Sequence, residues 1–123
     1  MNVLVVDDHE INRIVLVRIL QKLGYVADIA TNGEEAVAAV KSKSYQIVFM
    51  DIHMPVMDGA AAAKEILSSS LSPPHIIAVT GDWANQKICL ELGMVDFIEK
   101  PIGVQRIRQV IESLSTQIHN MDL

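Results

Sequence analysis

The chain has 123 residues, half of them hydrophobic and a fifth charged, with a formal net charge of -5. This length and balance predict one folded domain over residues 1–123 and exclude a disordered chain. The acidic charge argues against direct binding of nucleic acid, which depends on Lys and Arg to neutralise phosphates. No apolar run approaches the ~20 residues of a membrane-spanning helix, and nothing resembles a secretory signal, so we expect a cytoplasmic domain without a membrane segment. The single cysteine, Cys89, agrees with a reducing compartment.

Short apolar runs alternate with helical patterns along the whole chain. Such runs are typical of strands that are covered on both faces, so the alternation predicts an α/β fold with a parallel sheet. We expect five strands, at residues 2–6, 26–30, 46–50, 76–79 and 95–98.

Three helical stripes lie between or after these strands, and we expect each stripe to face the core. They consist of Ile11, Val15, Ile19 and Leu23; of Ala84, Ile88 and Leu92; and of Val104, Ile107, Ile111, Leu114 and Ile118.

The residues at the ends of the helical patterns support these assignments. Gly24 and Gly93 each follow a stripe, where a C-terminal cap often adopts a left-handed conformation. Asn32 and Glu35 resemble a capping box at a helix start. Residues 68–72, followed by two prolines, predict a surface connector before the fourth strand.

Chemically useful side chains follow four of the expected strands. Asp7 and Asp8 follow the first, Asp51 the third, Thr80 the fourth and Lys100 the fifth. Because the carboxyl ends of parallel strands meet at one edge of an open sheet, we expect these groups to converge. Clustered carboxylates repel one another, and Mg2+, a hard cation with oxygen ligands, relieves that repulsion. Asp51 could then attack phosphorus, while Lys100 and Thr80 stabilise the phosphoryl oxygens.

Four motifs in this order resemble the receiver domains of response regulators and hybrid histidine kinases, the phosphoacceptors of two-component signal transduction. They are Val5-Val6-Asp7-Asp8, the ten residues from Met50 to Gly59, Thr80-Gly81 and Phe97-Ile98-Glu99-Lys100-Pro101. As an ordered set they are highly specific, and they span essentially the whole chain. The resemblance implies a flavodoxin-like (βα)5 doubly wound parallel sheet with strand order 2-1-3-4-5.

The resemblance also assigns the residues of a phosphoacceptor and metal site. It makes Asp51 the residue that is phosphorylated. Asp8 and Asp51 would bind Mg2+ directly, Asp7 would act through a water molecule, and the backbone carbonyl of His53 would be a further ligand. Lys100 would pair with the phosphoryl group.

The remaining assignments from the resemblance concern the response to phosphorylation. Pro101 would follow a cis peptide bond that helps to aim the preceding lysine. Thr80 would move toward the phosphoryl group, and Phe97 occupies the position of an aromatic switch that is often tyrosine. The readout would be a rearrangement of the face formed by the fourth helix, the fifth strand and the fifth helix.

The same resemblance indicates the partners. The phosphodonor would be a histidine kinase or a histidine phosphotransfer domain, docking on the first helix near Ile11, Ile14 and Val15. The run from Asp8 to Arg13 looks more like the receivers of hybrid kinases than like stand-alone regulators. The domain would not be a turnover enzyme by itself; if it is part of a hybrid protein, the parent would be a histidine kinase.

Two other functions compete with this interpretation. Phosphatases with a nucleophilic aspartate need a second aspartate two residues later, where this chain has His53. A pseudo-receiver that binds proteins without phosphorylation is disfavoured by the complete set of site residues.

The sequence leaves the roles of several residues around the expected site open. We hypothesise that His53 and Asp82 tune the lifetime of the phosphoryl group from the rim, with ordinary exposed-loop residues as the alternative. Trp83 could belong to a partner surface or simply cover the loop. We interpret His9, His75 and His119 as ordinary surface histidines.

Overall fold

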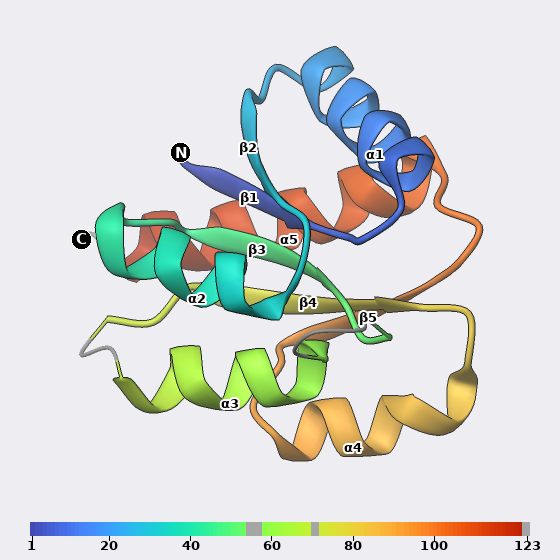
Figure 1. The fold of residues 1–123 in the computed structure, drawn as a ribbon. Helices are drawn as coiled ribbons and strands as arrows, with labels where there is room; N and C mark the ends of the chain where they lie inside the picture. Colours follow the sequence, from blue (N-terminus) through green and yellow to red (C-terminus); the bar gives the residue numbers. More distant parts are fainter. Residues whose placement is uncertain (54–57, 70–71, 122–123) are drawn as a thin grey trace.

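The computed structural model describes residues 1–53, 58–69 and 72–121, with the side chains of Trp83 and residues 117–121 excepted (Figure 1). Its sheet contains β1 (Val3–Val6), β2 (Ala27–Ala30), β3 (Ile47–Asp51), β4 (His75–Thr80) and β5 (Asp96–Glu99). All neighbouring strands are parallel, in the order β2-β1-β3-β4-β5. The predicted flavodoxin-like order is confirmed, and each predicted strand boundary is correct to within one residue.

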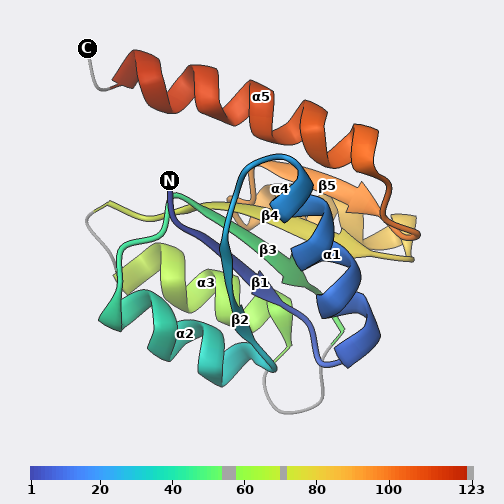
Figure 2. The same cartoon turned by 90° about the horizontal axis from the view of Figure 1, so that it is seen from above.

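Helices cover both faces of this sheet. They are α1 (Glu10–Lys22), α2 (Gly33–Ser42), α3 (Gly59–Ser69), α4 (Gln86–Glu91), which follows the short 3-10 helix η1 (Trp83–Asn85), and α5 (Val104–Met121). Figures 1 and 2 show α1 and α5 on one face and α2, α3 and α4 on the other.

Each face of the sheet has its own hydrophobic cluster, because successive side chains of a strand point to opposite faces. Phe49 and Ile77 pack with Leu20 of α1 and Ile107 of α5. Their strand neighbours Met50, Val48, Ile76 and Ala78 pack with α2, α3 and α4. This division explains why the central strands read as continuous apolar runs.

The predicted core stripe of α1 is wrong at two of its four positions. Ile19 is buried and Leu23 partly buried, but Ile11 is 75% exposed and Val15 is 43% exposed. The buried stripe instead includes Leu16, Ile19 and Leu20. Each four-residue step along a helix turns the side chain by about 40°, so a strict row of such steps leaves the core face within three turns.

The stripe predicted around α4 fails for the same reason. Ala84 lies in η1 and is exposed, and Ile88 is also exposed, whereas Cys89 is buried. The closing helix fits better because its spacing alternates between three and four residues. In α5 the buried side chains are Ile107, Val110, Ile111 and Leu114, and Ile118 lies outside the described side chains.

Both predicted glycine caps are confirmed, since Gly24 and Gly93 have φ values of 94° and 98°. At the start of α2, Asn32 accepts a hydrogen bond from the Glu35 N–H as predicted, at 2.8 Å. The Glu35 carboxylate, however, accepts from the N–H of Thr31 at 2.9 Å and not from that of Asn32. The first bond of the capping box is therefore present, but the bond from the Glu35 side chain goes to the residue before the expected one.

The predicted connector at residues 68–72 begins later in the chain than expected. Residues 68 and 69 belong to α3, and residues 70 and 71 lie outside the described part of the chain. In the described residues no helix is both long enough and apolar enough to cross a membrane.

Candidate functional site

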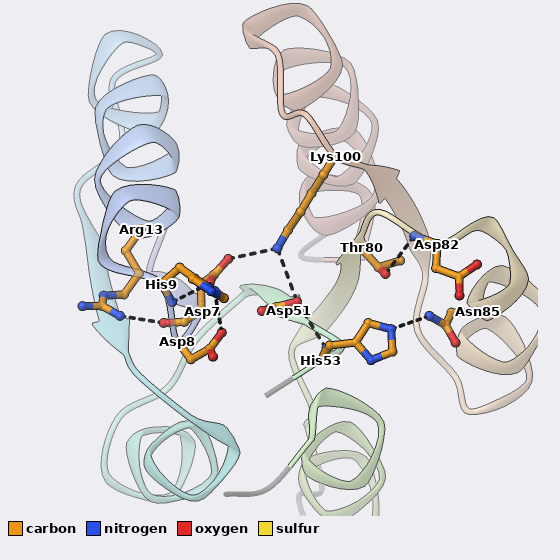
Figure 3. A network of polar contacts seen from close by, with 10 residues as sticks. All are labelled: Asp7, Asp8, His9, Arg13, Asp51, His53, Thr80, Asp82, Asn85 and Lys100. Atoms are coloured by element: carbon orange, nitrogen blue, oxygen red, sulfur yellow. Dashed lines mark hydrogen bonds and ion pairs between the residues drawn. The ribbon is translucent and has the colours of Figure 1, made fainter. Parts of the chain in front are cut away.

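The side chains that were predicted to converge do so at the carboxyl ends of the strands. Asp7 follows β1, Asp51 ends β3, and Lys100 follows β5. The Lys100 ammonium lies 3.5 Å from Asp7 Oδ2 and 3.5 Å from Asp51 Oδ1, so one cation is shared between two carboxylates (Figure 3). The parallel register places these three strand ends at the same edge of the sheet.

Local hydrogen bonds orient Asp7 and Asp8 at the start of α1. Asp7 is buried, and its Oδ1 accepts from the backbone N–H of His9 at 2.9 Å. The guanidinium of Arg13 donates to the backbone carbonyl of Asp7 at 2.8 Å and so ties the first turn of α1 to β1. Asp8 is half-buried, and its Oδ1 lies 3.0 Å from Nδ1 of His9. Sequence reasoning missed the roles of Arg13 and His9, whose only signal was their proximity to the aspartate pair.

Asp51 is a buried carboxyl group with a raised pKa. It is 3% exposed and shares the ammonium of Lys100 with Asp7. Burial raises its pKa to about 6, and the charges of Asp7 and Asp8 act in the same direction, against the opposing effects of Lys100 and of the His53 N–H. That N–H donates to Asp51 Oδ1 at 3.3 Å.

The carboxylates form an acidic cup that offers ligand atoms for a divalent cation. Ligand atoms from Asp7, Asp8, His9 and Asp51 all lie within 4.8 Å of one another. Three of these four donors are carboxylate oxygens, the ligands that Mg2+ prefers. The ammonium of Lys100 offsets one of the three carboxylate charges, so two negative charges are left for a divalent cation to offset. The carboxylate oxygens of this cup therefore fit Mg2+.

The start of α3 approaches the backbone of Asp51 closely at Gly59. A Cβ atom at this position would collide with the carbonyl oxygen of Asp51 and would lie 2.8 Å from Cα of Ile52. The Gly59 N–H donates to the Ile52 carbonyl at 3.0 Å, which holds the start of α3 against the end of β3. Residues 54–57 of the predicted motif lie outside the described residues.

Thr80 is buried at the end of β4, beside the strand ends that carry Asp51 and Lys100. Its hydroxyl accepts a hydrogen bond from the N–H of Asp82 at 3.2 Å. The Asp82 carboxylate accepts from the N–H of Ala84 at 2.9 Å and so stabilises the turn that begins η1. The ring of His53 bonds instead to Asn85, at 3.0 Å between Nε2 and Nδ2. Of the residues that line this rim, Asn85 was not anticipated.

Comparison with known families agrees with this arrangement. Residues 3–112 match the family described as the response regulator receiver domain. The chain belongs to this family. It is a receiver domain of the two-component phosphorelay, and its acidic cup lies where the phosphoacceptor site of such a domain is expected.

The receiver resembles domains of hybrid kinases in sequence and in structure. It is 35% identical to hybrid signal transduction histidine kinase F of Dictyostelium discoideum, over 89% of this chain but 11% of that protein. The chain thus spans about a tenth of the length of that kinase. A solved complex of the Saccharomyces cerevisiae histidine phosphotransfer protein Ypd1 contains the Ssk1 receiver domain, which is 31% identical with a TM-score of 0.82; the match covers 90% of this chain and 86% of that one.

A second solved structure bears on the acidic cup. The receiver domain of a sensor histidine kinase from Pseudomonas aeruginosa is 28% identical, with a TM-score of 0.84, and the match covers 92% of this chain and 95% of that one. That structure has a magnesium ion coordinated in its active-site cleft.

Strand β5, which carries the predicted switch residue Phe97, is bonded to α5 in this receiver. Phe97 is buried in the cluster beneath α3 and α4. Arg106 of α5 donates to Asp96 Oδ1 and to the Phe97 carbonyl, both at 2.9 Å, and so connects α5 to β5. The Lys100–Pro101 peptide bond is cis, as predicted.

Proposed function

We propose that Asp51 accepts a phosphoryl group from a phosphohistidine donor. The observation that carries this proposal is the sharing of Lys100 between Asp7 and Asp51 at 3.5 Å each, at the edge of an acidic cup. Asp51 is the last residue of the central strand β3, and its neighbours supply both the positive charge and the metal ligands that phosphoryl transfer needs.

The cation of this site is proposed to be Mg2+, held directly by Asp8, Asp51 and the backbone carbonyl of His53. An indirect role for Asp7 is supported by its contacts, because one of its oxygens accepts from the His9 N–H and the other faces Lys100. When bound, Mg2+ would offset the charge of the carboxylates and of the phosphoryl oxygens.

The transfer itself needs little beyond positioning. A carboxylate oxygen of Asp51 forms a bond to phosphorus while the bond from phosphorus to the donor imidazole nitrogen breaks, and the imidazole leaves with that electron pair. Lys100 donates to a phosphoryl oxygen. Thr80 would give up its bond from the Asp82 N–H and donate its hydroxyl to another phosphoryl oxygen.

The donor is proposed to dock on the first turns of α1. Ile11, Ile14 and Val15 form an exposed apolar group there, and the helix begins two residues after Asp8. A partner on this surface could therefore bring a phosphohistidine to the mouth of the cup. We propose that this donor is a histidine phosphotransfer domain or a histidine kinase, that the receiver is cytoplasmic, and that the parent protein is a hybrid histidine kinase.

The output is proposed to be a shift of the α4–β5–α5 face, with Thr80 and Phe97 as switch residues. The bonds from Arg106 to β5 connect α5 directly to the segment that ends at Lys100. In this proposal residues 1–123 act as one receiver, without turnover of external substrates and without direct binding of nucleic acid.

The deciding experiment is phosphorylation in vitro. The purified chain is incubated with Mg2+ and a phosphorylated histidine phosphotransfer protein, and separately with acetyl phosphate, and the intact mass is measured. We expect a phosphoryl adduct in the native chain and none in Asp51→Asn. Asp58→Asn is the matched control, because Asp58 is exposed in the same loop and its Oδ1 caps Ala61 at 2.7 Å, a bond that asparagine retains. Equal labelling of Asp51→Asn and the native chain would refute the proposal.

A further inference from the structure

His9 places an imidazole nitrogen among the carboxylates of the cup. Its Nδ1 lies 3.0 Å from Asp8 Oδ1 and 3.6 Å from Asp7 Oδ1, so it approaches two different carboxylates (Figure 3). The ring is otherwise largely exposed, and its backbone N–H is already held by Asp7. The start of α1 therefore places Nδ1 beside these carboxylates.

The two nitrogen groups of the site approach different pairs of carboxylates. Lys100 lies against Asp7 and Asp51, whereas His9 lies against Asp7 and Asp8. Lysine has no lone pair for a metal at neutral pH, but a neutral imidazole has one. Of the described side chains at the cup, His9 is the one that can add a nitrogen ligand to the oxygen donors.

A nitrogen ligand changes which cations a carboxylate site prefers. Imidazole binds Co2+, Ni2+ and Zn2+ well, whereas Mg2+ favours carboxylate, carbonyl and water oxygens. A site of three carboxylates and one imidazole therefore discriminates between these ions through its histidine.

We propose that His9 is a ligand of this cation site through Nδ1, and that it gives the receiver added affinity for late first-row divalent cations but not for Mg2+. This inference rests on the proposed function, since it takes the acidic cup to be the cation site. It predicts that Co2+ or Zn2+ in the cup of the native chain is bound by His9, whereas Mg2+ is not.

The test is titration of the metal-free chain with Co2+ alone and with Mg2+ alone, by isothermal titration calorimetry. Loss of supporting residues around a metal typically lowers affinity 10- to 100-fold, so loss of a ligand should cost at least about tenfold. We expect His9→Gln to weaken Co2+ binding by about that factor and to leave Mg2+ binding unchanged within about twofold. The visible absorption of bound Co2+ should also change, because a nitrogen ligand is replaced by an oxygen.

His75→Gln is the control for nonspecific binding by histidine. His75 begins β4, at the opposite end of the strand from Thr80, and its side chain is half-buried. This variant should retain both affinities and the Co2+ spectrum. His9→Asn provides a second, shorter replacement and should behave like His9→Gln.

The outcomes separate this inference from the proposed function. If His9→Gln binds Co2+ as tightly as the native chain, or loses Co2+ and Mg2+ affinity equally, the inference is refuted, although Asp51 could still be phosphorylated. Absence of Co2+ binding by the native chain would also overturn the inference. If Asp51→Asn is still phosphorylated, the proposed function fails whatever the His9 variants do.

Discussion

His53 and Asn85 form a hydrogen bond of 3.0 Å between their side chains, across 32 residues of sequence. The bond joins the segment after β3 to the 3-10 helix after β4, at the rim of the acidic cup (Figure 3). The same segment after β4 holds Thr80 through the Asp82 N–H. To move toward a phosphoryl group on Asp51, Thr80 has to give up the bond from the Asp82 N–H, and the His53–Asn85 bond opposes that release because it holds this segment in place.

We therefore expect Asn85→Ala and His53→Ala each to raise the rate of phosphorylation by acetyl phosphate. The increase should be about two- to fivefold, the effect of losing a hydrogen bond worth about 0.5–1 kcal/mol. The double variant should show no further gain, because both substitutions remove one interaction. Initial rates measured by intact mass test this prediction.

Lys87→Ala, an exposed position in α4, serves as the control and should leave the rate unchanged. Fully additive effects of Asn85→Ala and His53→Ala would show that the two residues act separately. Their hydrogen bond would then not be what limits the rate of phosphorylation.

The raised pKa of Asp51 predicts how stability depends on pH in the absence of metal. The group has a pKa of about 6 in the folded state and 3.8 as its ordinary value, so between these values the folded chain holds a proton that the unfolded chain has released. Stability should fall as pH rises through this window. The difference of about two pKa units corresponds to roughly 3 kcal/mol.

Asp51→Asn removes this titration, so at pH 7 and without metal it should be more stable than the native chain, by an amount up to about 3 kcal/mol. Urea unfolding at pH 4.5 and 7.5 in EDTA measures the effect. A steeper pH dependence in Asp51→Asn than in the native chain would mean that the charge of Asp51 does not destabilise the fold.

Mg2+ should stabilise the native chain at pH 7.5, because it binds the folded cup and not the unfolded chain. At a concentration about 100-fold above its dissociation constant the gain is about 2.7 kcal/mol. Thermal unfolding with Mg2+ and after removal by EDTA gives the measurement. Asp8→Asn should lose most of the gain, whereas Asp82→Asn, whose carboxylate caps its own turn, should keep it.

Gly59→Ala should destabilise the receiver and slow its phosphorylation. The added Cβ meets the backbone of Asp51 and Ile52, which cannot move aside as a flexible side chain can. Overpacking of this kind costs about 1–3 kcal/mol. Gly103→Ala is the matched control, since a Cβ there meets nothing within 4 Å. Chemical unfolding should separate the two variants, and equal stability would contradict the close approach.

Charged substitutions on α1 should separate docking from chemistry. Ile11→Asp and Val15→Asp should slow transfer from a phosphorylated histidine phosphotransfer protein by about tenfold or more, since burying an unpaired charge in an interface is costly. Their phosphorylation by acetyl phosphate should be unchanged. Val26→Asp, at a residue just before β2 that is also exposed, is the control. Transfer that is slowed equally by all three variants would place the docking surface elsewhere.

The strands and the convergence of the site residues could be predicted because they depend on local signals. Continuous apolar runs mark strands covered on both sides, and the runs that end at Val6, Met50 and Ile98 are each followed within two residues by a candidate site residue. Once the strands are parallel, Asp7, Asp51 and Lys100 must lie at one edge of the sheet.

The side of each helix that faces the core could not be predicted from the same local signals. Ile11, Val15 and Ile19 share a four-residue spacing, yet only Ile19 is buried, because the packing of the helix on the sheet decides which side of a broadly apolar helix faces inward. The surface that we propose for docking includes Ile11 and Val15, two residues that the pattern had assigned to the core.

The sequence alone determined the α/β class, the strands and the residues of the acidic cup, since these depend on the type and order of residues along the chain. The order of the strands came from the resemblance of its motifs to those of receiver domains. Only the tertiary structure decided the partners of individual side chains. The placement of His9 against Asp8, the bond from His53 to Asn85 and the sharing of Lys100 depend on distances between segments that packing alone sets. The spacing of residues in the sequence indicates whether a segment forms a helix or a strand. It does not fix which side of that element faces the core, or which side chains of other segments contact it.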